Sequence, residues 1–149
     1  MGLWYLAHIL GFTFWLGGGA AAMVVGIRGG QEDRATQAVV VRLLAGIHRS
    51  VILPGLLLAV ISGLYLSVRA AQVGAHPTAW LMLMQGAGLV AAILVLFISL
   101  PTLGRLTRIS PTGDTSTLFD ALRKRQRMAG MIAGILGLLA LLGGVLHKY

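Results

Sequence analysis

The sequence lacks cysteine altogether and contains only four acidic residues. Without cysteine the chain can form no disulfide, thiolate metal site or thiolate-ligated iron–sulfur cluster. The acidic residues all lie in connections between long apolar runs, so the runs themselves carry no carboxylate. This excludes catalysis by paired carboxylates and a proton relay built from intramembrane acids. No serine–histidine–acid set or phosphate-binding glycine loop is present either, and no catalytic residue is predicted. The four acids are Glu32, Asp33, Asp114 and Asp120.

What the sequence does contain is apolar side chains. Of its 149 residues 57% are hydrophobic and 11% are charged, and the mean hydropathy is +0.87. Several uncharged runs reach the length of about 20 residues that a helix needs to cross a bilayer. We therefore expect an all-α integral membrane protein: one domain, residues 1–149, folded as an up-down bundle of four transmembrane helices. The expected spans are residues 3–27, 50–68, 78–100 and 128–147, and the first is read as a retained span because no basic segment precedes it.

The net charge of +8 is unevenly distributed. Ten of the twelve Lys and Arg residues lie in the first and third connections, residues 28–49 and 101–127. The positive-inside rule places both connections in the cytoplasm and both termini outside, and we expect a multi-pass protein of a bacterial inner membrane. Orientation thus accounts for the basic charge without a nucleic-acid partner.

The first connection contains residues that predict helix ends. Gly29 and Gly30 should end the first helix, and Asp33 stands where a helix amino end favours negative charge. The second helix should therefore start at the membrane surface and run inward. Pro54 lacks a backbone donor and should bend that helix between residues 50 and 55.

The third connection should open at Pro101. Residues 110–113 predict a turn. Thr117 and Asp120 resemble a capping box, which would start the fourth helix about three turns before the membrane.

Small residues recur at a spacing of four in three of the expected helices. Such stripes let membrane helices approach closely, so they should mark the faces on which the bundle packs. The stripes are Gly18, Ala22 and Gly26; Gly55, Ala59 and Gly63; and Gly130 and Gly134.

His8 lies in the outer half of the first expected span, where an imidazole is costly unless it is used or hydrogen-bonded. Helical spacing places Phe12 and Trp15 on its face. This face could hold a flat apolar cofactor whose metal is bound by the imidazole, with Trp15 as a packing wall. Alternatively, His8 makes a structural hydrogen bond. Gln85, at a similar level in the third helix, is expected as its partner.

The other histidines and two methionines are further candidate metal ligands. His48 lies at the cytoplasmic boundary, roughly 20 to 25 Å from His8, so it would serve a different cofactor or face the lipid headgroups. Met82 and Met84 could bind Cu(I), but residues two apart point to different sides of a helix. His76 and His147 belong to the outer surface, from which either could approach His8.

Four short motifs resemble a superfamily of small four-span membrane proteins that includes the HemJ-type protoporphyrinogen oxidases and the CopD-type copper-resistance proteins. The motifs are the His8-Ile-Leu-Gly segment with Trp15-Leu-Gly-Gly, the segment from His48 to Pro54-Gly55, Ser62-Gly63-Leu, and Trp80-Leu81. In the oxidase branch, the resemblance implies a haem or porphyrin site with His8 as ligand. Met84 and Met82 stand where that branch carries lysine and histidine, so cofactor binding is implied here rather than porphyrinogen oxidation.

The sequence therefore favours a membrane protein that binds haem b or a related porphyrin through His8 and acts in electron transfer or haem handling. The expected cofactor-binding residues are His8, Trp15, Gln85 and His48, with His8 as the metal ligand. Two alternatives stay open. One is CopD-like copper handling, and the other is an accessory subunit without a cofactor, whose partners are lipid and other membrane subunits or a second copy.

Overall fold

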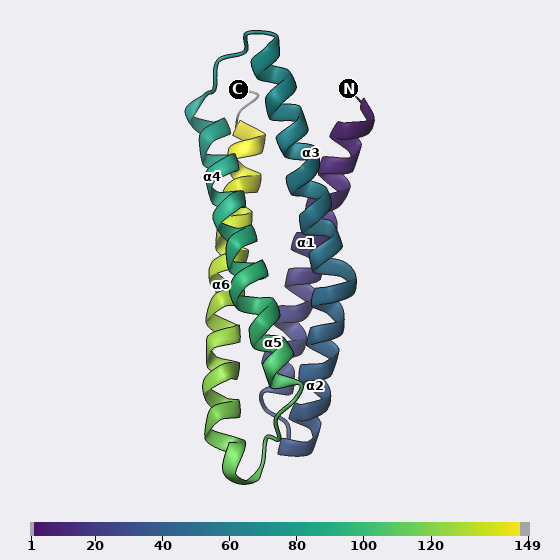
Figure 1. Ribbon diagram of the computed structural model, residues 1–149, viewed down its shortest axis with the longest axis vertical. Coiled ribbons are helices and arrows are strands. Elements are labelled where there is room, and N and C mark those ends of the chain that lie inside the picture. The colour runs from purple at the N-terminus through teal and green to yellow at the C-terminus, as the bar shows by residue number, and fades with distance from the viewer. Residues whose placement is uncertain (1, 147–149) are drawn as a thin grey trace.

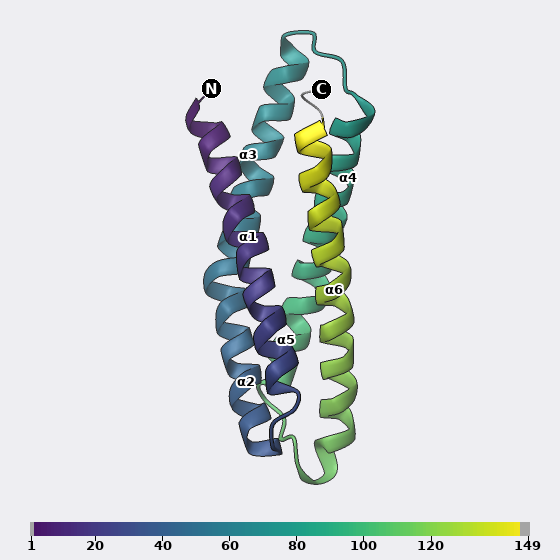
Figure 2. The same cartoon turned by 180° about the vertical axis from the view of Figure 1, so that it is seen from behind.

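The computed structural model describes residues 2–146 as a bundle of four long antiparallel helical rods (Figures 1 and 2). The start of α1 and the end of α6 lie at the same end of the bundle, as an even number of antiparallel rods requires (Figure 1). In the described residues there is no strand, and the predicted all-helical class is confirmed.

The first rod is α1 (Gly2–Gly29) and the fourth is α6 (Ser116–Leu146). The second and third rods are each interrupted by five residues of wider π-helix. The second consists of α2 (Arg34–Ile47), η1 (His48–Ile52) and α3 (Leu53–Gln72), and the third of α4 (Ala79–Leu94), η2 (Val95–Ser99) and α5 (Leu100–Leu106). A short 3₁₀ turn, η3 (Gly113–Thr115), precedes α6.

All four rods are long and apolar enough to cross a membrane. Each extends beyond its predicted span at the end of the bundle opposite the termini: α1 to Gly29, the second rod from Arg34, the third to Leu106 and α6 from Ser116. Many large apolar side chains on their outer faces are exposed, among them Leu3, Phe97 and Leu138. Such a surface needs an apolar environment.

The start of α2 agrees with the sequence. α1 ends at Gly29, and the Asp33 carboxylate accepts hydrogen bonds from the backbone and hydroxyl of Thr36 at 2.9 Å each. These bonds cap the helix and hold the pKa of Asp33 below its usual value.

Asp120 does not act as predicted. Its carboxylate pairs with both terminal nitrogens of Arg34, at 2.6 and 2.9 Å, instead of closing a capping box with Thr117. α6 already begins at Ser116, so Asp120 lies on its second turn and faces α2. The pair therefore joins the second rod to the fourth.

Both π-helical turns precede a proline. Pro54 and Pro101 are each the second residue of the α-helix that follows. A proline cannot donate to the carbonyl four residues earlier, which belongs to Ser50 or Phe97, and its ring crowds that carbonyl. The wider turn relieves both problems. The bend predicted before Pro54 thus takes the form of η1, whereas the prediction that Pro101 opens a connection is wrong: the helix continues to Leu106.

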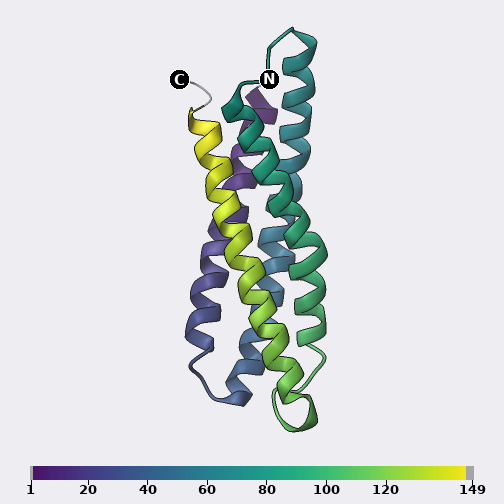
Figure 3. The ribbon, with the colours of Figure 1, turned by 90° about the vertical axis from the view of Figure 1, so that its left-hand side faces the viewer.

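The rods pack as two close pairs, α1 with α3 and α4 with α6 (Figure 3). At the first pair the backbones nearly touch: a Cβ added to Gly11 would lie 2.5 Å from the Ala59 nitrogen, and one added to Gly55 would lie 2.7 Å from the Trp15 nitrogen. The predicted stripe of Gly55, Ala59 and Gly63 therefore faces α1. No larger side chain fits at this crossing without moving a helix.

The small residues predicted to pack α6 are the wrong ones. A Cβ on Gly130 or Gly134 would meet nothing within 4 Å among the described residues. The packed face of α6 instead includes Ala133, Ala140 and Gly143, which are buried. Gly143 lies against the backbone of Trp80 and Met84 on α4.

Candidate functional site

His8 lies at the crossing of α1 and α3. Its Nδ1 is 2.8 Å from the carbonyl oxygen of Ala59 and 3.4 Å from Ser62 Oγ. Because the carbonyl can only accept, Nδ1 is the donor, and in the neutral ring Nε2 then carries the lone pair. Among residues 2–146, Nε2 has no hydrogen-bond partner. The ring is held in one tautomer, with a lone pair free to bind a metal.

Gly63 makes room for the imidazole. A Cβ at this position would lie 2.8 Å from His8 Cε1. Ser62, which is fully buried, donates to the carbonyls of Leu58 and Ala59 and so supports the helix turn that holds the ring. The motif Ser62-Gly63 on the second rod therefore positions the histidine of the first.

The aromatic neighbours of His8 agree with the sequence in part. The Phe12 ring centroid is 6.0 Å from that of His8 and 5.3 Å from that of Trp15, which is buried in the core. Gln85 does not meet His8: its amide donates to Ser67 Oγ at 2.8 Å, because this part of α4 faces α3 rather than α1. The predicted hydrogen bond between Gln85 and His8 is wrong.

A groove of about 340 Å³ begins next to this site. Phe12 lines it and also lies beside the His8 ring, whereas His8 itself does not line it. Its remaining walls come from α1 and α6: Ile9, Thr13, Leu16, Gly17 and Leu141. The volume falls at the lower end of the range for small-molecule sites.

The other candidate ligands lie elsewhere. His76 is exposed in the connection before α4, and His147 lies outside the described residues. Met82 is exposed, while the Met84 sulfur packs against Gly144 of α6. Within residues 2–146 no three His, Cys, Asp or Glu side chains gather around a point.

His48 is buried inside the bundle rather than exposed to headgroups. It stands in η1, donates from Nδ1 to the Leu44 carbonyl at 2.9 Å, and leaves Nε2 as an acceptor 3.4 Å from the Gln126 amide nitrogen. Ser99, at the end of η2, is also fully buried. Over the described part of the chain, Ser99 Oγ and Gln126 Oε1 are the buried side-chain atoms without a hydrogen bond.

These polar residues form one layer across the bundle. The core consists of two apolar clusters, one around Leu56 and one around Phe119. On each of three rods, the polar residue falls between a member of one cluster and a member of the other: His48 between Ala45 and Ile52, Ser99 between Val95 and Leu103, and Gln126 between Leu122 and Ala133. His48, Ser99 and Gln126 are called the polar layer below.

Sequence reasoning missed two of its three members. Gln126 stands between Arg125 and Arg127 and was taken as part of a basic connection. Its position four residues after Leu122 on one helix face was the available indication that it points inward.

The stability of a Ser99 variant tests whether the Ser99 hydroxyl, which has no hydrogen-bond partner among the described residues, is bound by water or an ion. Ser99→Ala removes a hydroxyl that has no partner, so we expect unchanged or higher stability, by up to about 1 kcal/mol. Denaturation of the detergent-solubilised protein by sodium dodecyl sulfate measures this, with Ser50→Ala, which removes an exposed hydroxyl, as control. A loss of more than about 1 kcal/mol would mean that a water molecule or ion satisfies Ser99 Oγ.

No family model, curated protein or solved structure matches this chain. The fold and its interior therefore define the class by themselves: an all-α bundle whose four rods are long and apolar enough to span a membrane. It carries two oriented histidines inside, His8 near the end with the termini and His48 in the polar layer.

Proposed function

We propose that this protein spans a bacterial inner membrane and binds haem b or a related porphyrin through His8, for electron transfer or haem handling. The connections at residues 30–33 and 107–115 would face the cytoplasm, because the flanking segments are basic. His8 would then lie in the outer half of the bilayer.

One observation carries this proposal: His8 donates from Nδ1 to a backbone carbonyl and keeps Nε2 free. Histidines that ligate metals have this arrangement, in which the second hydrogen bond fixes the tautomer and raises the basicity of the ligating nitrogen. A porphyrin supplies four ligands to its own iron, so one imidazole is enough to anchor it.

The residues around His8 fit a flat apolar ligand. Gly63 leaves room for the imidazole ring itself, and Ser62 and Ala59 set the orientation of the ring. Phe12 continues the apolar surface from the histidine to the neighbouring groove. When bound, haem would supply a reversible one-electron couple, and the chain's part would be to orient the ligand and to exclude water.

His48 fits a ligand role less well, since its Nε2 already faces the Gln126 amide. In this proposal the polar layer is structural, and it connects the two apolar clusters rather than binding the porphyrin.

A visible spectrum of the gently solubilised protein, recorded oxidised and reduced, tests the proposal together with metal analysis. We expect a Soret band that shifts on reduction and iron in a fixed ratio to protein. A colourless protein with stoichiometric copper would replace haem by copper handling. A colourless, metal-free protein that co-purifies with other membrane subunits would instead identify an accessory subunit.

A further inference from the structure

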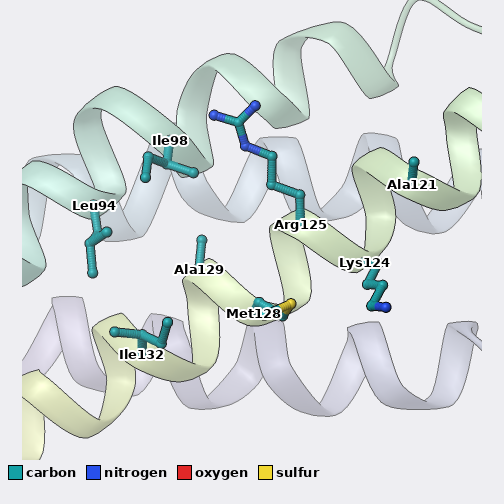
Figure 4. A pocket seen from close by; sticks show the side chains of 8 residues that line it. All are labelled: Leu94, Ile98, Ala121, Lys124, Arg125, Met128, Ala129 and Ile132. Carbon is teal, nitrogen blue, oxygen red and sulfur yellow. The ribbon is translucent and has the colours of Figure 1, made fainter.

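A second groove, of about 400 Å³, lies between the third and fourth rods. Leu94 and Ile98 point into it from their rod, and Arg125 extends from α6 toward the rod that carries Ile98 (Figure 4). Most of its walls are apolar. The lining residues are Leu94, Ile98, Ala121, Lys124, Arg125, Met128, Ala129 and Ile132.

The groove is apolar along one part and basic at one end. From Lys124 to Ile132 it follows α6 for about 12 Å, given a rise of 1.5 Å per residue. Lys124 and Arg125 stand at the end away from the chain termini, where the connection at residues 107–115 turns the chain. Met128 and Ile132 continue toward the middle of the bundle.

The two basic side chains have no carboxylate of their own. Asp120, one turn before Lys124, is engaged by Arg34. That is the one ion pair among residues 2–146, so neither Lys124 nor Arg125 is neutralised within the described chain. Arg123 and Arg127 add further positive charge to the same stretch of α6.

We propose that this groove binds one anionic phospholipid, with an acyl chain along Leu94, Ile98, Met128 and Ile132. Its phosphate would lie at Arg125, which extends toward the rod with Ile98, and Lys124 would add positive charge at the same level of α6. The chemistry of the groove identifies the ligand. Its apolar walls can pack against a hydrocarbon chain, and the cations at one end, which have no carboxylate partner among the described residues, can bind a phosphate at headgroup depth. The proposal rests on the membrane placement proposed above but not on haem.

The test uses delipidated protein in dodecyl maltoside, to which phosphatidylglycerol or phosphatidylcholine with the same acyl chains is added. Native mass spectrometry counts the lipid retained. We expect one phosphatidylglycerol to be retained at concentrations at which phosphatidylcholine is not. The double variant Lys124→Gln/Arg125→Gln should weaken retention about thirtyfold, since each of the two surface cations contributes about 1 kcal/mol to binding an anionic lipid.

Two controls separate this site from general attraction to a basic protein. Arg28→Gln/Arg42→Gln removes the same charge from exposed positions outside the groove and should leave retention unchanged. Met128→Trp fills the groove at a side chain that is 52% exposed, so the fold should survive, and it should weaken retention although every charge remains. Circular dichroism checks the helix content of each variant.

Equal retention of the two lipids would overturn the proposal. So would an equal loss in the Arg28/Arg42 control, or full retention by Met128→Trp. Glycerol 3-phosphate alone should not compete; competition at similar concentrations would mean that the site takes a free phosphate rather than a lipid, and would overturn it as well. A colourless protein that still selects phosphatidylglycerol would refute the haem proposal and support this one.

Discussion

Gly11→Ala is expected to destabilise the bundle by about 1–3 kcal/mol, although it adds a single methyl group. The new Cβ would lie 2.5 Å from the Ala59 nitrogen and 2.7 Å from the Gly55 carbonyl oxygen. Both are backbone atoms in the middle of a helix, so no side chain can rotate away and the two helices must separate. Separation would also strain the hydrogen bond from His8 to the Ala59 carbonyl.

Alanine at Gly130 or Gly134 provides the matched control. Neither added Cβ would meet another described atom within 4 Å, and alanine favours a helix over glycine by about 1 kcal/mol. These variants should therefore be as stable as the parent or more stable. Denaturation by sodium dodecyl sulfate, followed by circular dichroism, compares the three variants with the parent protein. If Gly11→Ala matched the controls, the close crossing of α1 and α3 would be wrong.

His8→Ala is expected to abolish the Soret band of the purified protein while the helix content stays unchanged. The reason is that His8 Nε2 is the proposed iron ligand, and its removal leaves no second imidazole at the α1–α3 crossing in the described structure. Because His8 is only partly buried, the fold should tolerate alanine at this position. The spectrum is recorded after equal haem supply during expression.

Two comparisons make this result specific. His76→Ala alters an exposed histidine of the connection before α4 and should keep the full Soret band. His8→Gly should regain absorbance when imidazole is added, as expected when the only loss is a ligand. A Soret band of wild-type intensity in His8→Ala would remove His8 from the proposal and leave the fold unaffected.

Much of the fold could be predicted from local sequence. Apolar runs of spanning length gave the four helices, and the Gly29-Gly30 pair and Asp33 gave the junction between the first two. Pro54 marked a departure from the α-helix in the second rod, which the structure shows as η1. Each of these features depends on a few consecutive residues, so no knowledge of their neighbours in space was needed.

The packing partners could not be predicted in the same way. The sequence identified His8 as a residue that needs a partner and proposed Gln85, whereas the structure supplies the Ala59 carbonyl. A backbone carbonyl becomes available there only because glycines let α3 approach α1 closely. The same holds for Gln126, whose neighbours in sequence are basic but whose side chain joins the polar layer.

The sequence by itself therefore determined that the chain forms four apolar helices, and where the connection between the first two lies. Only the tertiary structure decided which face of each helix lies inside. In a water-soluble bundle, the buried face can be read from its hydrophobic stripe. Here the exposed faces of the helices also carry many large apolar side chains, and the small residues of α6 at Gly130 and Gly134 were no guide. Helix contacts alone distinguish Ala133, Ala140 and Gly143, which pack inward, from the glycines that do not.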